Sequence, residues 1–264
     1  MPVPLQTNRE SSPAALPAVP EAFSRREGAV DAAEVLGWLF RHVDPRRIVV
    51  TTSFGMEGCC LLDLAAGAFA AGPGRADPAA RLRVIYIDTD FLFPEILAVR
   101  DRLAEKYPQL AFERISPLLS PEEQAEAHGP ALWARDPDRC CGIRKVEPLN
   151  RALAGAQVWL TALRRGQGGG RANLPAVAHD ARHDLLKVCP LASWDRPAVW
   201  QHCQSHGVPT NPLHERGYPS LGCTHCTKAV PGSRPDEYTR LGRWSGTGKT
   251  ECGLHYTDNE PTAR

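Results

Sequence analysis

Short apolar stretches alternate with longer amphipathic stretches along most of the chain. The short stretches are rich in β-branched and apolar residues, which is typical of buried strands, whereas apolar residues in 30–40 and 197–206 recur at helical spacing. Strands that alternate with helices indicate βαβ units, so we expect an α/β fold with a doubly wound, mostly parallel sheet. The predicted strands are 47–52, 82–87, 110–115, 157–161 and 184–188.

The two ends of the chain lack this alternation. Residues 1–28 begin with a run rich in Pro, Ala and Ser and are predicted to be a disordered lead-in. Residues 29–206 are predicted to form the α/β domain, with a surface loop at 66–80. In 207–264 Gly, Pro, Cys and basic residues dominate, so this part is predicted to be an irregular C-terminal extension folded over the sheet edge.

In a parallel sheet, ligands bind beyond the carboxyl ends of the strands. The polar segments that directly follow the predicted strands are therefore the first places to search for a site. These segments are 51–58, 88–93, 161–171 and 189–195.

Length and charge narrow the class of protein. The chain has 264 residues, with 31 Lys and Arg against 30 Asp and Glu, so its net charge is +1. This length suits one α/β domain, and the balanced charge argues against bulk nucleic-acid binding. The apolar runs are too short to span a bilayer, and no basic segment followed by an apolar one begins the chain. We expect a soluble, cytoplasmic protein without nucleic-acid or membrane partners; its oligomeric state stays open.

Nine cysteines in a chain without an export signal favour metal or redox chemistry over structural disulfides. Cys140 and Cys141 are adjacent, and Cys223 and Cys226 form a CxxC pair, which together supply four thiolates. Adjacent side chains on a helix point about 100° apart, so they reach the corners of a [4Fe–4S] cube more easily than one zinc ion held at about 2.3 Å. The spacing favours an iron–sulfur cluster, with structural zinc, a redox-active pair or buried thiols as alternatives.

A further cysteine has the surroundings of a nucleophile. Cys252 lies on a glycine-flanked tail with Lys249 and His255 nearby, and positive neighbours favour the reactive thiolate. The alternative is an unimportant cysteine near a chain end. Four other cysteines fall on apolar helices or strand ends and are predicted to be core thiols: Cys59, Cys60, Cys189 and Cys203.

Two features point to an anionic ligand. The turn Ser53-Phe54-Gly55 between a strand and a helix can present backbone N–H groups and the helix dipole to one or two phosphate-like groups, or it can be an ordinary capped turn. Basic residues also gather after predicted strands or beside cysteines. Together they suggest a small dianionic ligand, although each alone is typical of solvated surface charge: Arg144, Lys145, Arg164, Arg165, Arg240 and Arg243.

These segments together resemble the assimilatory sulfonucleotide reductases, which reduce adenylyl sulfate (APS) or phosphoadenylyl sulfate (PAPS) and have an adenine-nucleotide α-hydrolase-like fold. The resemblance spans about residues 48–255. The first two matching motifs are shared with other nucleotide-binding proteins, whereas the whole set is specific. The motifs are TTSFGME at 51–57, IDTDFLFPE at 87–95, CCGIRKVEPL at 140–149, ERGYPSLGCTHCT at 215–227 and KTECGLH at 249–255.

The resemblance implies a reaction and a cofactor. A CC…CxxC set marks the cluster-bearing branch, which mostly uses APS, so Cys140, Cys141, Cys223 and Cys226 are expected to hold a [4Fe–4S] cluster. Cys252 takes the place of the nucleophile that attacks the sulfate sulfur, expels AMP and forms a thiosulfonate. Thioredoxin would then release sulfite. The cluster is not expected to carry electrons in this cycle.

The resemblance also implies substrate contacts in a nucleotide-binding domain at 29–206. Lys145 is expected between cluster and substrate, with Arg164 or Arg165 on the loop after the fourth strand. On the tail, which would close over substrate, the matching residues are Arg240, Arg243 and His255. The sequence departs from the family pattern at Gly58, Asp90 and Ala162.

Three other functions stay open at this point. The first is the same chemistry on PAPS. The second is an ATP-dependent nucleotide-activating enzyme of the same fold, such as a tRNA-thiolating one, which would need a richer phosphate loop and a broader basic surface. The third is a non-catalytic, zinc-stabilised nucleotide-binding module.

Overall fold

One six-stranded sheet organises the chain, and the computed structural model describes its residues 16–255. The strand order is β3-β2-β1-β4-β6-β5, and every neighbouring pair is parallel except β5 with β6. The predicted mostly parallel sheet is therefore confirmed. The strands are β1 Ile48–Thr51, β2 Leu82–Ile87, β3 Leu110–Ile115, β4 Val158–Leu160, β5 Val177–Asp180 and β6 Leu185–Val188.

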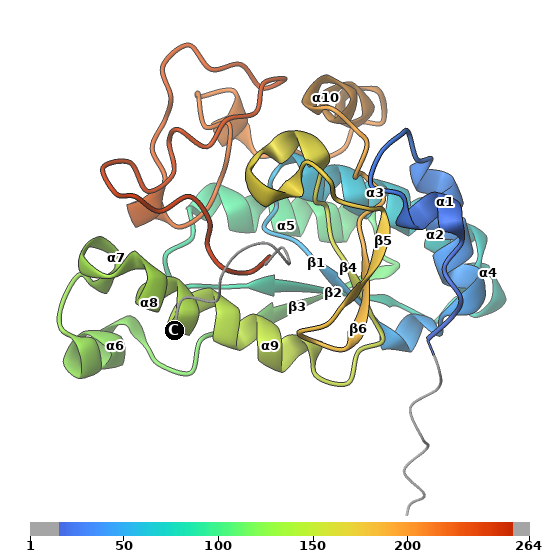
Figure 1. Ribbon diagram of the computed structural model, residues 1–264, viewed down its shortest axis with the longest axis horizontal. Helices are drawn as coiled ribbons and strands as arrows, with labels where there is room; N and C mark the ends of the chain where they lie inside the picture. Colours follow the sequence, from blue (N-terminus) through green and yellow to red (C-terminus); the bar gives the residue numbers. More distant parts are fainter. Residues whose placement is uncertain (1–15, 256–264) are drawn as a thin grey trace, which may run out of the picture.

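Helices cover both faces of this sheet (Figure 1). Val50 and Val84 face the larger core, which they share with α2, α3, α5 and α10, whereas Val49 and Ile85 face α9 on the other side. This alternation between faces follows from the two-residue period of a strand. The helices are α1 Glu21–Ser24, α2 Ala32–His42, α3 Met56–Ala71, α4 Pro73–Ala76, α5 Pro94–Lys106, α6 Pro121–His128, α7 Leu132–Arg135, α8 Pro137–Cys141, α9 Glu147–Leu153 and α10 Arg196–Ser205.

Two local predictions were wrong. Strand β5 was missed because it is a short edge strand whose last residues, His179 and Asp180, are polar and partly exposed. The segment 66–80 is not one surface loop, since α3 continues to Ala71 and α4 follows. The alanine-rich sequence there favours helix, and Phe69 anchors it in the core.

The segment before α2 is also more ordered than predicted. Phe23 of α1 is buried and packs edge-on against Trp38, with 5.9 Å between ring centroids. The Arg165 guanidinium donates to the backbone carbonyls of Gly28 and Arg25. The prediction of disorder was therefore wrong for 16–28, and residues 1–15 lie outside the described part.

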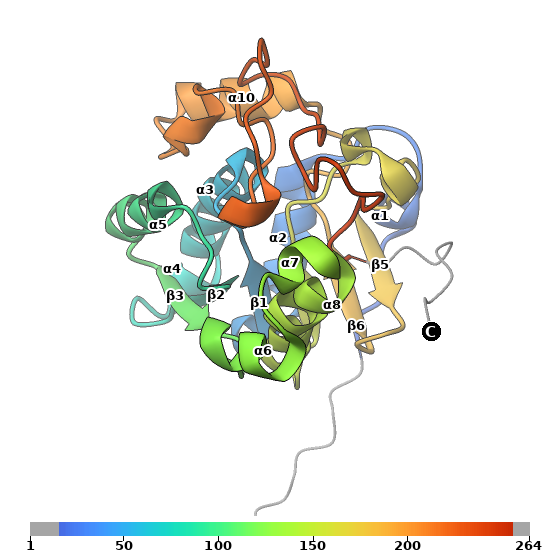
Figure 2. The same ribbon diagram turned by 90° about the vertical axis from the view of Figure 1, so that its left-hand side faces the viewer.

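The C-terminal extension folds over the carboxyl ends of the strands (Figures 1 and 2, orange to red). Backbone N–H of Thr224 donates to the carbonyl of Phe91, and Met56 N–H donates to His214 Nε2, so the extension is tied to the loops after β2 and β1. The last residues, 256–264, lie outside the described part. Among the helices within 16–255, none combines the length and apolar character needed to cross a bilayer.

The packing of Phe23 gives a test of this correction. We expect Phe23→Ala to lower the free energy of unfolding by about 3 kcal/mol, because a buried aromatic ring and its contact with Trp38 are lost. Urea denaturation measures this as a lower midpoint at unchanged slope. Glu21→Ala, on the exposed face of α1, is the control. Equal midpoints for both variants would contradict the buried placement.

Candidate active site

A cavity of about 220 Å³ opens at the carboxyl ends of β1, β2 and β4, beneath the C-terminal extension. Its walls combine apolar side chains such as Ile85 and Trp159 with polar groups from the strand ends, which is typical of a small-molecule site. Among the described residues, four Lys and Arg side chains line the cavity: Lys145, Arg171, Arg240 and Arg243.

The turn after β1 forms one wall of the cavity. Phe54 has a φ of 55° and its N–H donates to Thr52 Oγ1, while Gly55 begins α3. Ser53, Phe54 and Gly55 all line the cavity, but the Phe54 ring lies in the core. A Cβ at Gly58 would meet Thr52 Oγ1 at 2.5 Å. Any larger residue at position 58 would therefore collide with Thr52, which explains why this chain has glycine where it departs from the family pattern.

A buried carboxylate holds this turn in place. Glu57 accepts hydrogen bonds from Arg164 at 2.7 Å and from Arg196 at 2.9 Å. Burial alone would raise the pKa of Glu57, but the charges of Arg196 and Arg164 outweigh it and lower this pKa to about 2. The side chain is therefore ionised at neutral pH and joins α3, α10 and the loop after β4.

Two arginines that were predicted to contact the substrate lie outside the cavity. Arg164 is 1% exposed, pairs with Glu57 and does not line the cavity. Arg165 donates to the carbonyl of Leu174 and to the segment before α2, so it does not line the cavity either. The loop supplies Arg171 instead, seven residues further along the chain than Arg164.

The four cysteines of the CC…CxxC set line one small second cavity. Cys140 and Cys141 end α8, and Cys223 and Cys226 flank a 3₁₀ turn of the extension. After α8 the chain forms a π-helical turn, 142–146, which is frequent at functional sites. The structure therefore brings together all four predicted ligands from two distant segments.

The surroundings of these thiols fit an anionic group. Arg144 also lines this cavity, and its buried Nη2 has no hydrogen-bond partner within residues 16–255. A buried cationic donor beside four thiols suits an anionic cluster.

Charged and aromatic groups surround the four thiols. Asp90, at the second departure from the family pattern, has a φ of 59° and accepts from Arg144 at 2.9 Å, so its charge is paired. His225 stacks on Trp133 with ring centroids 4.0 Å apart, and both line the cavity. Thr89 Oγ1 lies 3.2 Å from Cys223 Sγ. The thiols thus lie within a largely enclosed polar and aromatic shell.

Lys145 lies between the two cavities and lines both. Burial would lower the pKa of its ammonium group, but the nearby thiols of Cys223, Cys252 and Cys141 more than offset this and raise the pKa. The side chain is therefore a buried cation that faces the cysteine set on one side and Cys252 on the other. That it lies between a cluster and the substrate stays a prediction.

The tail brings Cys252 into the main cavity, where it is partly exposed. The preceding residue, Glu251, accepts from Arg171 at 2.7 Å and lies 3.3 Å from Arg240. Lys249 pairs with Asp138 on α8. Ion pairs of two residues that precede Cys252 thus fix the tail just before this thiol.

The other predicted tail residues also lie in the main cavity. His255 stacks on Trp159, with ring centroids 4.9 Å apart, and its buried Nδ1 has no partner within residues 16–255. Burial and the charges of Lys187 and Arg171 lower the pKa of His255 well below its usual value, so it is neutral. Arg243 donates to the carbonyls of Leu221 and Cys226, which braces the CxxC segment.

Several residues of the site were not predicted from the sequence. Arg171 lies at the end of a segment, 161–171, that follows a strand, so its position carried a signal. Trp159 carried none, because a tryptophan within an apolar strand is typical of a core. Glu57 and Glu251 lie inside the matching motifs, but a carboxylate gives no signal of a role in a cavity that is predicted to bind an anion.

Comparisons with known proteins agree with this geometry. A family model described as phosphoadenosine phosphosulfate reductase domain matches residues 47–229. Two curated proteins named adenosine 5'-phosphosulfate reductase are each 42% identical to this chain. One, from Shouchella clausii (strain KSM-K16), matches over 85% of this chain and 88% of its own; the other, from Lysinibacillus sphaericus (strain C3-41), over 85% and 90%.

A solved structure supports the fold independently. Phosphoadenylyl-sulfate (PAPS) reductase from Candida auris, in a phosphate complex, superimposes with a TM-score of 0.60 at 28% identity, covering 76% of this chain and 91% of that one. The predicted adenine-nucleotide α-hydrolase-like fold is thereby confirmed. The chain belongs to the phosphoadenosine phosphosulfate reductase domain family.

Proposed function

We propose that this protein reduces adenylyl sulfate to sulfite and AMP, with Cys252 as nucleophile and thioredoxin as reductant. One observation carries the proposal: Cys252 lies in the same cavity as four basic side chains, at the carboxyl ends of the strands. Relatives named adenosine 5'-phosphosulfate reductase at 42% identity support the choice of substrate.

The reaction divides into three displacements. The Cys252 thiolate attacks the sulfate sulfur, an S–S bond forms, the bond from sulfur to the bridging oxygen breaks, and AMP leaves with the electron pair. A thioredoxin thiolate then attacks Cys252 Sγ, which releases sulfite and forms a mixed disulfide. The second thioredoxin thiol closes the thioredoxin disulfide and restores Cys252. Thioredoxin supplies the two electrons that convert sulfate sulfur to sulfite.

The cavity residues have matching roles in this scheme. Arg171 and Arg240 can hold the phosphate and sulfate oxygens, because their donors face the cavity and already bind a carboxylate. Lys145, beside Cys252, would stabilise the thiolate and the charge that develops as AMP leaves. Neutral His255 offers its unpartnered Nδ1 as a further hydrogen-bonding group. Arg243 acts chiefly through the CxxC segment that it braces.

We further propose that Cys140, Cys141, Cys223 and Cys226 hold a [4Fe–4S] cluster. Their shared cavity and the orphaned donor of Arg144 support it. When bound, the cluster would supply a fixed anionic centre and a cross-link between α8 and the extension. This cross-link would lie beside the main cavity, because Lys145 lines both the main cavity and the cavity of the four cysteines.

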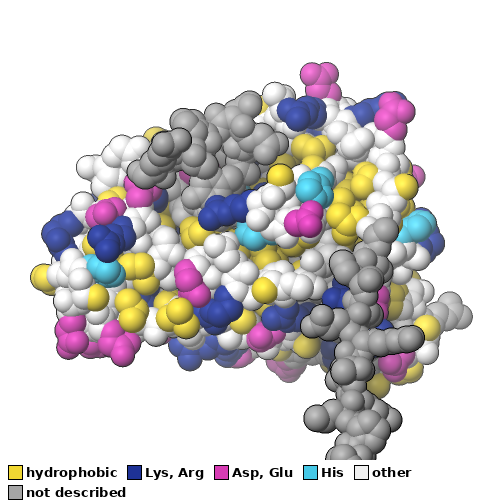
Figure 3. Space-filling model, turned by 60° about the horizontal axis from the view of Figure 1, so that its bottom comes forward, with side chains coloured by type: hydrophobic (Ala, Val, Ile, Leu, Met, Phe, Trp, Pro, Cys, Tyr) yellow, Lys and Arg dark blue, Asp and Glu magenta, His cyan; other side chains and the backbone are white. Residues whose placement is uncertain are grey.

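The alternative functions have less support. Reduction of PAPS is favoured by the Candida auris relative, but at 28% identity. On the face drawn in Figure 3, basic and acidic side chains are interspersed, unlike the broad basic surface that a tRNA-modifying enzyme needs. A non-catalytic zinc-stabilised module would not need a thiol such as Cys252 in the cavity that the basic side chains line. The nine free cysteines support a reducing, cytoplasmic location.

The nucleophile can be trapped directly. We expect protein incubated with APS in the absence of reductant to gain one SO₃ unit on the peptide that contains Cys252, because the thiosulfonate has no second thiol to release it. Peptide mass spectrometry measures the adduct. Cys252→Ser should form no adduct and no sulfite while still binding AMP.

The same measurement tests the substrate and the rival activities. With PAPS we expect a slower adduct, since an additional phosphate enters a cavity with a limited set of cations. If PAPS labels Cys252 as fast as APS or faster, PAPS rather than APS is the substrate. An adduct on another cysteine, or sulfite formation by Cys252→Ser, would show that the nucleophile is misassigned.

The cysteine set gives a separate prediction. We expect Cys223→Ser to lose iron and sulfide, because one of four ligands is removed, whereas Cys189→Ala should retain them, since Cys189 is buried away from this cavity. Metal and sulfide analysis of anaerobically purified protein provides the measurement. Zinc without iron in the unsubstituted protein would favour the zinc-stabilised module.

The ion pairs of the tail also make a prediction. We expect Glu251→Gln to raise the alkylation rate of Cys252 about tenfold without nucleotide, because the charge-assisted bonds to Arg171 and Arg240 weaken. Peptide mapping after timed iodoacetamide treatment measures the rate. Glu147→Gln removes an exposed pair with Arg151 on α9 and is the control. An unchanged rate in Glu251→Gln would mean that this pair does not fix the tail.

A further inference from the structure

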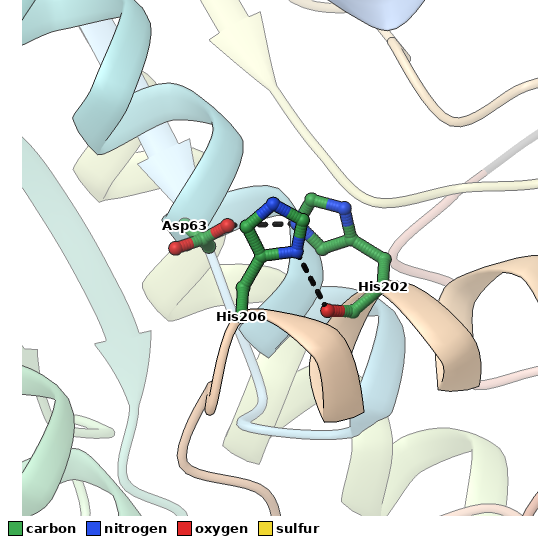
Figure 4. Close-up of side chains that lie close together, drawn as sticks. All are labelled: Asp63, His202 and His206. Carbon is green, nitrogen blue, oxygen red and sulfur yellow. Dashed lines mark hydrogen bonds and ion pairs between the residues drawn. The ribbon is translucent and has the colours of Figure 1, made fainter.

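A second group of metal-ligating side chains lies on the outside of the α3–α10 pair, apart from the four-cysteine set. Asp63 lies midway along α3, His202 lies near the end of α10, and His206 follows that helix by one residue. One ligand atom from each lies within 4.8 Å of the others, and Figure 4 shows the three side chains turned toward one another. We propose that these residues bind a divalent transition-metal ion of the zinc type.

The groups around these three residues are already arranged as they are around metal ligands. Tyr107 Oη donates to Asp63 Oδ1 at 2.7 Å, which leaves Oδ2 toward His202. His206 Nδ1 lies 3.0 Å from the backbone carbonyl of His202, which fixes the ring and leaves Nε2 for the ion. Metal-binding histidines almost always use their second nitrogen in this way, and ligating carboxylates are themselves hydrogen-bonded.

The contact between His202 and Asp63 requires little rearrangement, but the two imidazole rings must turn, because they are stacked with centroids 4.1 Å apart and planes 21° apart. His202 Nε2 and Asp63 Oδ2 are 2.7 Å apart, and two ligands of one tetrahedral zinc ion lie about 3.3 Å apart. Binding would replace this hydrogen bond with two metal bonds, while the imidazole proton moves to Nδ1 or to solvent. Two imidazoles and one carboxylate suit Zn²⁺ better than Ca²⁺ or Mg²⁺, and a water would complete the site.

The charge around the site has two opposing contributions. The carbonyl end of α10 carries partial negative charge, and Asp63 adds a full one, so both favour a cation. Lys106 opposes it, because its ammonium binds the carbonyls of His206 and Gly207 nearby. His206 is exposed, so an ion can enter from solvent. This balance favours a site of moderate affinity.

The ion would link the same two helices that Glu57 and Arg196 link at the main cavity. Glu57 precedes Asp63 by six residues on α3, and Arg196 precedes His202 by six on α10. A metal here would therefore be a second link, six residues further along both helices, in a pair whose first turns carry the Glu57–Arg196 bond of 2.9 Å. Its expected effect is on stability and on the geometry of that pair.

Zinc binding to the full-length protein tests this inference. The probe is Zn²⁺ in competition with a chromophoric chelator, with every protein carrying Cys252→Ser to remove the thiol of the main cavity. We expect His206→Ala to weaken one zinc site at least about 100-fold, and Tyr107→Phe to weaken it about tenfold through the loss of the outer hydrogen bond. The thermal midpoint should rise with Zn²⁺ only where the site is intact.

A matched histidine provides the control. His179 is exposed and lies 3.0 Å from Asp184, but within the described residues no third ligand joins that pair. His179→Ala should therefore bind Zn²⁺ like the parent. Equal zinc affinity in the parent and in His206→Ala would overturn the proposal. An equal loss in His179→Ala would do the same, because it would reveal only general binding to surface histidines.

Discussion

The buried ion pairs of Glu57 are the constraint on which the site depends. One carboxylate, 7% exposed, forms ion pairs with two arginines that come from the loop after β4 and from the start of α10. Removing one partner of such a group leaves an uncompensated buried charge, which costs about 3 to 5 kcal/mol. The turn after β1, the loop that carries Arg171 and the helix that supports His214 therefore keep one relative arrangement.

Four further arginines around the site each have a local anion or carbonyl oxygen. Arg144 has Asp90, Arg243 has backbone carbonyls, and Arg171 and Arg240 share Glu251. A net charge of +1 is therefore compatible with a strongly cationic cavity, because the balancing acids lie on the surface or behind the cations. The local field, rather than the overall charge, prepares the cavity for an anion.

The sequence predicted the sheet and the cysteine geometry because both depend on local patterns. Buried strands have apolar runs, and four thiols at two spacings define a ligand set wherever the chain brings them. The sequence could not predict whether an arginine side chain points into the cavity or into the interior of the protein. Arg164 follows a strand like a ligand-binding residue, yet Glu57, more than a hundred residues earlier, draws it into the interior. The buried ring of Phe23 was missed for the same reason, since Trp38 lies outside its own segment.

The position of Glu251 connects charge to access. Arg171 and Arg240 line the cavity, so an anion bound there and the Glu251 carboxylate draw on the same donors. Glu251 is bonded directly to Cys252 along the backbone, and Lys249 ties the tail to α8, the helix that ends in Cys140 and Cys141. An anion that binds Arg171 and Arg240 would therefore weaken their bonds to Glu251 and so shift the neighbouring thiol of Cys252. The ion pair of Lys249 limits how far the tail can move.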